Sequence, residues 1–320
     1  MHKEDMPMGA IKYSYMDHWF MNSPQGLTKA NVRREFVEFY IRQISALGFK
    51  GLDIFFFDIW RYARMFGSFK NYITFLQDFG IEKVVGFFAT AHGEARTTNA
   101  FIRESHDNIY RQFEGYCAAT EDTGVENIIL MPAPTYYQCE PMTDEKIRIL
   151  ADLWNRVGEM TLTRFGIKIT CHHEFWCGLR DEESILKFYE WTDPRYVFFF
   201  LDTAQHVIAG VDPVKLYMKL HDRTAGFHLK DTHNIAGPED YRTPPDSELM
   251  VKDVPRWFFE VGTPGGLCDF PRLYQCIREY GYKGWISVEH DKAEIGGGNF
   301  TESTANAMWY IKNVLSRIYQ

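Results

Sequence analysis

The sequence predicts a single (β/α)8 TIM barrel, an α/β fold, that spans residues 1–320. Short apolar runs recur at fairly even spacing, and amphipathic stretches with apolar residues at i, i+3 and i+4 separate them. No segment has the composition of a domain linker, and 320 residues suffice for one large domain. The alternative, a doubly wound open sheet, is weakened because no GxGxxG follows the first apolar run.

Eight strands are expected from these apolar runs, which are rich in β-branched and aromatic residues. The expected strands are 10–16, 49–57, 81–89, 125–132, 166–175, 196–203, 225–231 and 283–290.

Helices are expected between the strands. The clearest segment is 27–51, where Thr28 is a plausible N-cap and Gly48 ends the helix before the next strand. Segments 139–166 and 270–284 repeat this design. Residues 232–259 contain prolines, glycines and charges with weak periodicity, so we expect a long loop there that acts as a lid after the seventh strand.

The composition excludes several classes of partner. The net charge is -8 and the pI about 5.8, which argues against nucleic acid or an anionic membrane as the main partner. The N-terminal residues lack the apolar core of a signal peptide, and no apolar run approaches the ~20 residues of a membrane span. The six cysteines have no CxxC spacing and are expected to be reduced thiols in a cytoplasmic protein. Aromatic residues make up 16% of the chain, which indicates either a bulky core or an aromatic-walled pocket.

Ionisable residues stand at the ends of the last four expected strands. They are Glu174, Asp202, His228 and Glu289. Because barrel active sites lie at the carboxyl ends of the strands, these four side chains are expected to meet. Each alone has an ordinary interpretation: a strand-terminal Asp is usually a helix N-cap, and a strand His is usually a satisfied core residue. Together they would be costly to crowd without a cation, and this oxygen-rich set suits one Mn²⁺, with Mg²⁺, Co²⁺ or Fe²⁺ as alternatives.

The segments "FLDTAQHVIAGVDP", "FHLKDTH" and "DFPRLYQCIREYGYKGWISVEHD" resemble the sugar isomerase/epimerase superfamily with the xylose-isomerase-like barrel. The resemblance implies that Glu174, Asp202, His228 and Glu289 are the metal ligands. Within the superfamily, the chain is most similar to inosose dehydratases and to the metal-binding subunit of C-glycoside deglycosidases. Both act on keto-sugar or keto-inositol substrates by proton abstraction and elimination.

The chain departs from the family pattern at Gln205. Many relatives read Asp-Thr-Gly-His where this chain reads "DTAQH", so Gln205 takes the position of the family's histidine. The DNA-repair endonuclease branch uses that histidine in a multinuclear zinc site. Its loss, together with the acidic net charge, favours one metal ion and argues against DNA cleavage.

The stretch "ITCHHEFWCG" places two histidines before Glu174. Since side chains alternate along a strand, His172 is expected to face the barrel mouth with Glu174, and His173 to face the helices. His172 is then a catalytic base or acid, with orientation of Glu174 as the alternative role, and His173 is structural. By the same alternation Lys230 lies beside His228, where it holds a substrate oxygen or forms a salt bridge with a carboxylate.

Four further residues are candidate substrate contacts. Gln205 is expected to contact a hydroxyl group, and Trp176 to stack on a sugar face or an aromatic aglycone. Arg180 lies in the same loop, and Asp53 could face the pocket from the second strand.

The sequence therefore predicts a metal-dependent lyase in which proton loss beside a ketone precedes β-elimination. A ketose 3-epimerase or isomerase that uses Glu174 and Glu289 is the alternative, and a non-catalytic sugar-binding barrel is a third. The partner is a small sugar or sugar conjugate, and an oligomer is expected. The resemblance leaves open whether a second, smaller subunit completes the enzyme.

Overall fold

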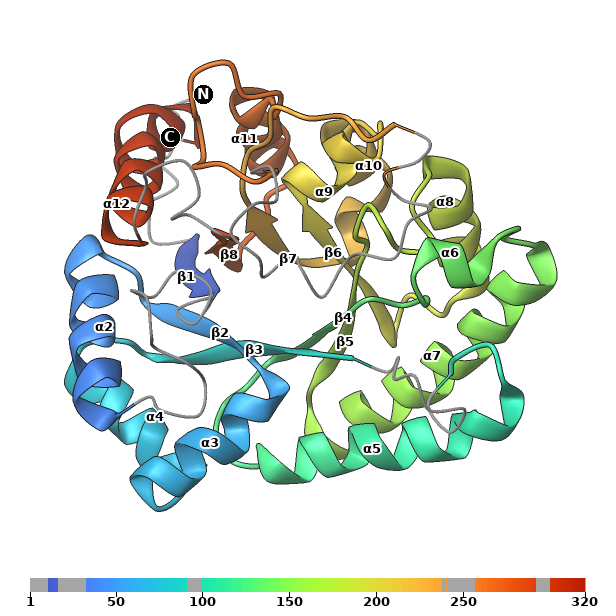
Figure 1. Cartoon of the computed structure of the whole chain (residues 1–320), viewed down its shortest axis with the longest axis horizontal. Coiled ribbons are helices and arrows are strands. Elements are labelled where there is room, and N and C mark those ends of the chain that lie inside the picture. The colour runs from blue at the N-terminus through green and yellow to red at the C-terminus, as the bar shows by residue number, and fades with distance from the viewer. Residues whose placement is uncertain are drawn as a thin grey trace, which may run out of the picture.

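The computed structural model describes residues 11–16, 33–90, 99–237, 240, 257–291 and 300–319. Eight parallel strands form a closed barrel in the order β1-β2-β3-β4-β5-β6-β7-β8 (Figure 1). The strands are β1 Lys12–Met16, β2 Gly51–Phe55, β3 Lys83–Ala89, β4 Asn127–Leu130, β5 Lys168–His172, β6 Val197–Asp202, β7 Thr224–Leu229 and β8 Trp285–Val288. The predicted fold is confirmed. Seven of the expected strands contain the observed ones, and β7 begins at Thr224, one residue before the expected start.

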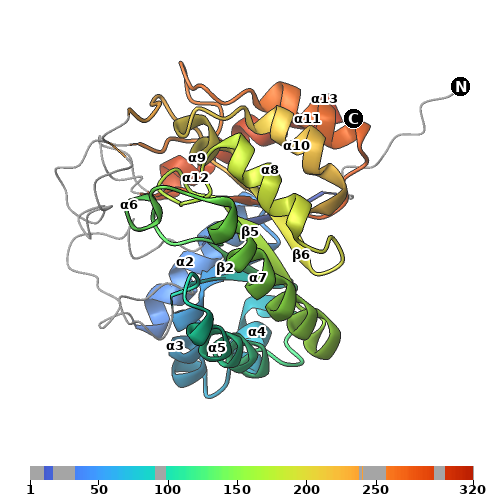
Figure 2. The same cartoon turned by 90° about the vertical axis from the view of Figure 1, so that its right-hand side faces the viewer.

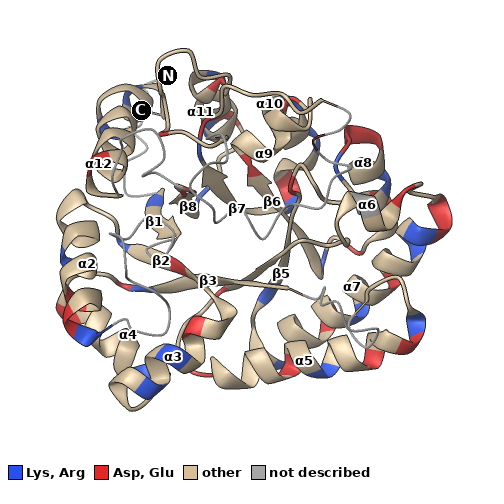
Figure 3. Cartoon of the chain, viewed as in Figure 1, with Lys and Arg blue, Asp and Glu red and all other residues tan. Residues whose placement is uncertain are grey.

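Helices surround the barrel on its outside, as the side view also shows (Figure 2). In chain order they are α2 Arg34–Leu47, α3 Phe56–Phe66, α4 Phe69–Asp78, α5 His106–Ala119, α6 Tyr136–Cys139, α7 Asp144–Phe165, α8 Glu182–Trp191, α9 Thr203–Ile208, α10 Pro213–Leu220, α11 Phe270–Glu279, α12 Phe300–Tyr310 and α13 Ser316–Tyr319. Figure 3 shows Lys, Arg, Asp and Glu residues distributed over these outer helices. None of the helices described is long and apolar enough to cross a membrane.

The helix ends follow the expected signals where the structure describes them. Gly48 ends α2 with a φ of 101°, a left-handed conformation that glycine adopts without strain. The Thr143 hydroxyl caps α7 by accepting a hydrogen bond from the Lys146 amide. The N-cap expected at Thr28 lies outside the described residues.

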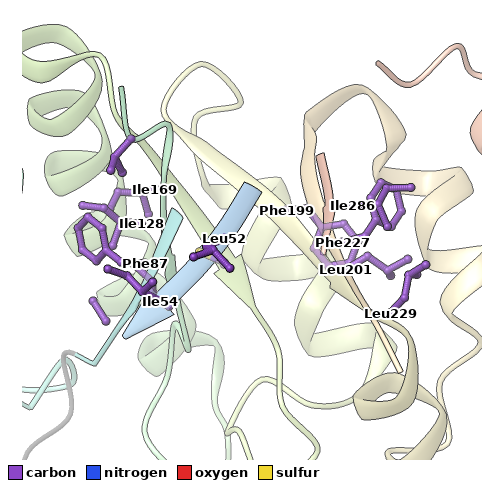
Figure 4. Close-up of a cluster of buried hydrophobic side chains, with 14 of the residues drawn as sticks. Leu52, Ile54, Phe87, Ile128, Ile169, Phe199, Leu201, Phe227, Leu229 and Ile286 are labelled. Atoms are coloured by element: carbon purple, nitrogen blue, oxygen red, sulfur yellow. The ribbon is translucent and has the colours of Figure 1, made fainter. Parts of the chain in front are cut away.

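The main hydrophobic core lies between the strands and the helices. Strand residues that face outward fill this layer (Figure 4). They include Leu52, Ile54, Phe87, Ile128, Ile169, Phe199, Leu201, Phe227, Leu229 and Ile286, all fully buried. Because alternate residues point the other way, this packing turns the remaining strand residues toward the barrel axis.

The barrel interior is polar at the level of the strand centres. Asp53 on β2 and Ser14 on β1 are buried there, and the Ser14 hydroxyl donates to Asp53 Oδ2 at 3.0 Å. Burial raises the pKa of Asp53. Gly86 on β3 is paired with Asp53, and a Cβ at this glycine would lie 3.0 Å from Asp53 Oδ1. The small residue therefore leaves room for a carboxyl group inside the barrel.

The long loop expected after β7 is anchored at both ends. Asp231 and Phe259 exchange two backbone hydrogen bonds of 2.8 Å, and the Thr232 hydroxyl donates to the Trp257 carbonyl at 2.8 Å. Residues 238–239 and 241–256 of the expected 232–259 lid lie outside the described residues. The role of this segment as a lid stays a prediction.

Candidate metal centre at the carboxyl ends of the strands

Four buried side chains from the last four strands meet at the barrel mouth. His172, Asp202, His228 and Glu289 each offer one ligand atom, and these atoms lie within 4.8 Å of one another. The register of the strands brings these side chains together. Asp202 is paired with His228 across β6 and β7, and Leu229 is paired with Val288 across β7 and β8. Lys230 and Glu289, the residues that follow this second pair, therefore lie next to each other. We call these four residues the metal cluster.

His172 is held by its neighbours in the metal cluster. Its Nε2 lies 3.0 Å from Asp202 Oδ2 and 3.2 Å from His228 Nδ1. Since an ionised carboxylate only accepts hydrogen bonds, Nε2 of His172 carries the proton toward Asp202, and Nδ1 keeps the lone pair. This Nδ1 is buried, and it has no hydrogen-bond partner among the described residues.

His228 shows the same arrangement with its nitrogens exchanged. Its Nδ1 lies 3.0 Å from Glu289 Oε2 and 3.2 Å from His172 Nε2. The buried Nε2 has no hydrogen-bond partner within the described part of the chain. An unsatisfied imidazole nitrogen beside two carboxylates fits a divalent metal ion.

Asp202 belongs to the metal cluster and also caps the N-terminus of α9. Its Oδ1 accepts a hydrogen bond of 2.8 Å from the Gln205 amide and caps α9, while Oδ2 faces His172 and Lys230. Burial alone would raise the pKa of Asp202, but the Lys230 ammonium and His172 outweigh it and lower this pKa. The N-cap role and the cluster role, which the sequence presents as alternatives, are both present.

Lys230 is buried among three carboxylates. Its Nζ lies 2.5 Å from Glu289 Oε2, 2.7 Å from Asp291 Oδ2 and 3.2 Å from Asp202 Oδ2. Burial would lower the pKa of this amine, but these carboxylates raise it well above its ordinary value. The salt-bridge interpretation of Lys230 is thus observed, and the ammonium stays charged next to the cluster.

Glu174 lies beside the metal cluster and is not one of its four members. Its Oε1 is 3.7 Å from His172 Nδ1. Burial raises the pKa of Glu174 to about 7, although His172 and Lys230 oppose the shift. The structure thus brings together three of the four ligands expected from the sequence, with His172 in the fourth place.

His173 points to the helices, as the alternation predicts. Its Nδ1 lies 3.0 Å from the Leu179 carbonyl, and its Nε2 lies 3.2 Å from the Tyr189 hydroxyl on α8. Burial holds the pKa of His173 well below its ordinary value. His173 therefore joins strand to helix and takes no part in the cluster.

The expected substrate contacts have different surroundings. Gln205 is buried, and its side-chain oxygen accepts a 3.0 Å hydrogen bond from the Phe175 amide. Trp176 is half-buried, 4.7 Å from Phe175 between ring centroids. Arg180 lies over the Tyr136 ring at 5.8 Å. Asp53 lies inside the barrel, where burial raises its pKa and His228 opposes that rise.

Asp291 is a charged member of the site that the sequence reasoning missed. It lies two residues after Glu289, so alternation along the extended chain gave the signal that both would face the same partner. Among Glu174, Asp202, Glu289, Asp291 and Lys230, the four carboxylates face one ammonium. A divalent cation would offset this excess of negative charge.

A closed parallel barrel with acidic and imidazole side chains at its carboxyl mouth defines a class of metal-binding barrel proteins. Residues 41–312 match the xylose isomerase-like TIM barrel family, and the chain belongs to that family.

Named relatives agree with this membership. The chain is 30% identical over 151 residues to an inosose dehydratase of Lacticaseibacillus casei, an alignment that covers 47% of this chain and 49% of the relative. The chain thus spans about half the length of this curated relative.

Solved structures share the fold over nearly the whole chain. A probable 3-DHS dehydratase from Bacillus anthracis has a TM-score of 0.71 at 12% identity, covering 95% of this chain and 99% of that one. The IOLI protein, whose crystal structure binds a zinc atom, has a TM-score of 0.70 at 15% identity, covering 97% and 99%.

Proposed function

We propose that this chain is a metal-dependent lyase that removes a proton next to the ketone of a keto-sugar or keto-inositol and then expels a β substituent. The observation that carries the proposal is the buried metal cluster next to Lys230 and Glu174. The inosose dehydratase relatives support a dehydration, and the resemblance to deglycosidases supports cleavage of a 3-oxo-C-glycoside.

The proposed ion is Mn²⁺, because the site combines carboxylates with imidazole. The sequence assigns the four ligands to Glu174, Asp202, His228 and Glu289. The geometry favours a second assignment, in which His172 replaces Glu174. When bound, the metal would supply Lewis acidity that polarises the substrate carbonyl.

Proton abstraction falls to His172 or Glu174. In the first assignment the base is His172 Nδ1, whose ring is oriented by the hydrogen bond from Nε2 to Asp202. In the second the base is Glu174, whose pKa of about 7 is suited to accept a proton near neutral pH. In both, the Lys230 ammonium stabilises the negative charge that develops on the substrate oxygen, and the leaving group departs with the electrons of its bond to the β carbon.

Three substrate classes separate the candidate activities. We would incubate the Mn²⁺-loaded protein with a keto-inositol, a free ketohexose and a 3-oxo-C-glycoside, and analyse the products by mass spectrometry in deuterated water. Dehydration or release of the aglycone supports the lyase. Epimerised ketohexose with no elimination product would replace it with the epimerase alternative, in which Glu174 and Glu289 shuttle the proton. A protein treated with EDTA should be inactive and regain activity with Mn²⁺.

We also propose that the chain works as an oligomer. Co-purification from the native host would show whether a second, smaller subunit accompanies the chain, as the deglycosidase resemblance implies. Light scattering after gel filtration would give the mass of the assembly.

A further inference from the structure

The barrel mouth has a charged half and an aromatic half. The strands β5 to β8 contribute the metal cluster and Lys230. On β2 and β3, Phe55 is paired with Phe88. Asp53 faces the barrel interior from β2, and Phe55 follows two residues later on the same face.

Three phenylalanine rings lead away from the metal cluster. The Phe88 ring lies 5.6 Å from the His172 ring at 86°. Phe55 lies 6.1 Å from Phe88 at 62°, and Phe57 is stacked on Phe55 at 5.2 Å and 3°. All three are half-buried, and none belongs to the hydrophobic core clusters of the described residues. We call Phe55, Phe57 and Phe88 the phenylalanine wall.

Phe57, the ring farthest from the metal cluster in this series, is held in place by the charged side chain of Arg61. The Arg61 guanidinium lies over the Phe57 ring, 5.4 Å from its centroid, and forms an ion pair with the buried Asp58. Phe57 in turn backs Phe55. Phe55 and Phe88 are therefore presented by a rigid support, which lowers the entropy that binding a flat group against them would cost.

We propose that the phenylalanine wall binds an aromatic group that the substrate carries, while the charged half holds its keto-sugar ring. This inference rests on the proposed function and narrows its substrate class to aryl-substituted keto-sugars. Aromatic rings pack edge-to-face or offset against other rings, which is the contact that Phe55 and Phe88 offer. A free inositol bears a hydroxyl on nearly every carbon, and hydroxyls placed against these rings would lose hydrogen bonds to water without replacement.

The test compares two substrates that differ only in the group on the anomeric oxygen: the 3-oxo forms of phenyl O-glucoside and of methyl O-glucoside, from which β-elimination releases phenol or methanol. In Phe55→Leu and Phe88→Leu, which keep an apolar side chain, KM for the phenyl substrate should rise about tenfold. KM for the methyl substrate should stay within about twofold. Phe39→Leu, whose side chain is 60% exposed on α2, is the matched control and should change neither value. Equal changes for both substrates, or none for either, would overturn the inference.

A binding measurement keeps the inference separate from the reaction. Phenol should bind the protein as purified, detected by saturation-transfer NMR, and the signal should fall in Phe55→Leu and Phe88→Leu but not in Phe39→Leu. Phenol binding without turnover of any keto-sugar would support the phenylalanine wall as a binding site for aromatic groups and contradict the proposed reaction. Turnover of the methyl substrate without phenol binding would support the proposed reaction and contradict binding of an aromatic group at the phenylalanine wall.

Discussion

The Lys230 ammonium lies 2.5 Å from the Glu289 carboxylate, with Lys230 1% and Glu289 5% exposed. The same nitrogen reaches Asp202 and Asp291, so one buried amine balances three acids. The free energy of unfolding must depend on this amine, because removing one partner of a buried ion pair leaves charge without compensation.

Lys230→Met is expected to destabilise the protein treated with EDTA by about 3–5 kcal/mol in urea unfolding. Added Mn²⁺ should recover part of this loss, because a divalent ion replaces the missing positive charge. Lys215→Met is the control: Lys215 pairs with Asp212 on the surface with 61% of its side chain exposed, and a change of about 0–1 kcal/mol is expected. Similar losses in the two variants would contradict a special role for Lys230.

Asp202→Asn separates the two tasks of this residue. Asparagine is also a good N-cap, so α9 and the melting temperature should be largely preserved. Bound metal, measured by elemental analysis, should fall to a small fraction of the wild-type content, because a neutral amide is a weaker ligand for a divalent ion. Asp212→Asn, which changes the N-cap of α10, should retain its metal. Full metal content in Asp202→Asn would remove this residue from the ligand set.

His172→Ala and Glu174→Gln assign the fourth ligand and the base. If Glu174 is the ligand, His172→Ala keeps its metal and loses about 10²–10⁴ in rate, while Glu174→Gln loses metal. If His172 is the ligand, His172→Ala loses its metal, and Glu174→Gln keeps its metal and loses about 10²–10⁴ in rate. Deuterium exchange at the carbon next to the ketone gives the second readout, and a His172→Ala protein that exchanges at the wild-type rate rules out His172 as the base.

His206 should make stability depend on pH. Burial lowers its pKa to about 4, so the folded state holds the ring neutral while the unfolded state protonates it below about 6.5. The unfolded state then binds more protons, and stability present above about pH 6.5 is lost as the pH falls toward 4. Between pH 7 and pH 5 this group alone should cost about 2 kcal/mol.

His206→Phe, which keeps a ring but cannot titrate, should flatten the pH dependence by about that amount in urea unfolding at the two pH values. The comparison between pH 7 and pH 8 serves as the control, since a histidine in either state is mostly neutral there. An unchanged slope between pH 7 and pH 5 would show that His206 is not the group responsible.

Much of the site follows from two regularities of the barrel. Parallel strands bring their carboxyl ends to one mouth, and alternation decides which side chains enter it. These regularities placed Asp202, His228 and Glu289 together and turned His173 toward Tyr189 on α8. The same alternation, applied one step further along the chain, would have included Asp291.

Other contacts depend on side-chain direction at strand ends, which spacing does not determine. Glu174 lies two residues beyond the end of β5, and its carboxylate lies beside the metal cluster and not within it. The contact of Gln205 with a substrate hydroxyl stays a prediction, and the hydrogen bond that its side-chain oxygen accepts from the Phe175 amide, in the loop after β5, was not expected. The spacing of residues in the sequence predicts neither the position of the Glu174 carboxylate nor the hydrogen bond of Gln205.

The shared carboxylate of Asp202 links the chemistry of the site to a backbone proton. Oδ2 faces the metal cluster, while Oδ1 accepts from the Gln205 amide at 2.8 Å. Any change in charge on one oxygen redistributes electron density over the other. The chemical shift of the Gln205 amide in the ¹⁵N-labelled protein should therefore follow metal occupancy, which gives a spectroscopic titration of the site without substrate or turnover.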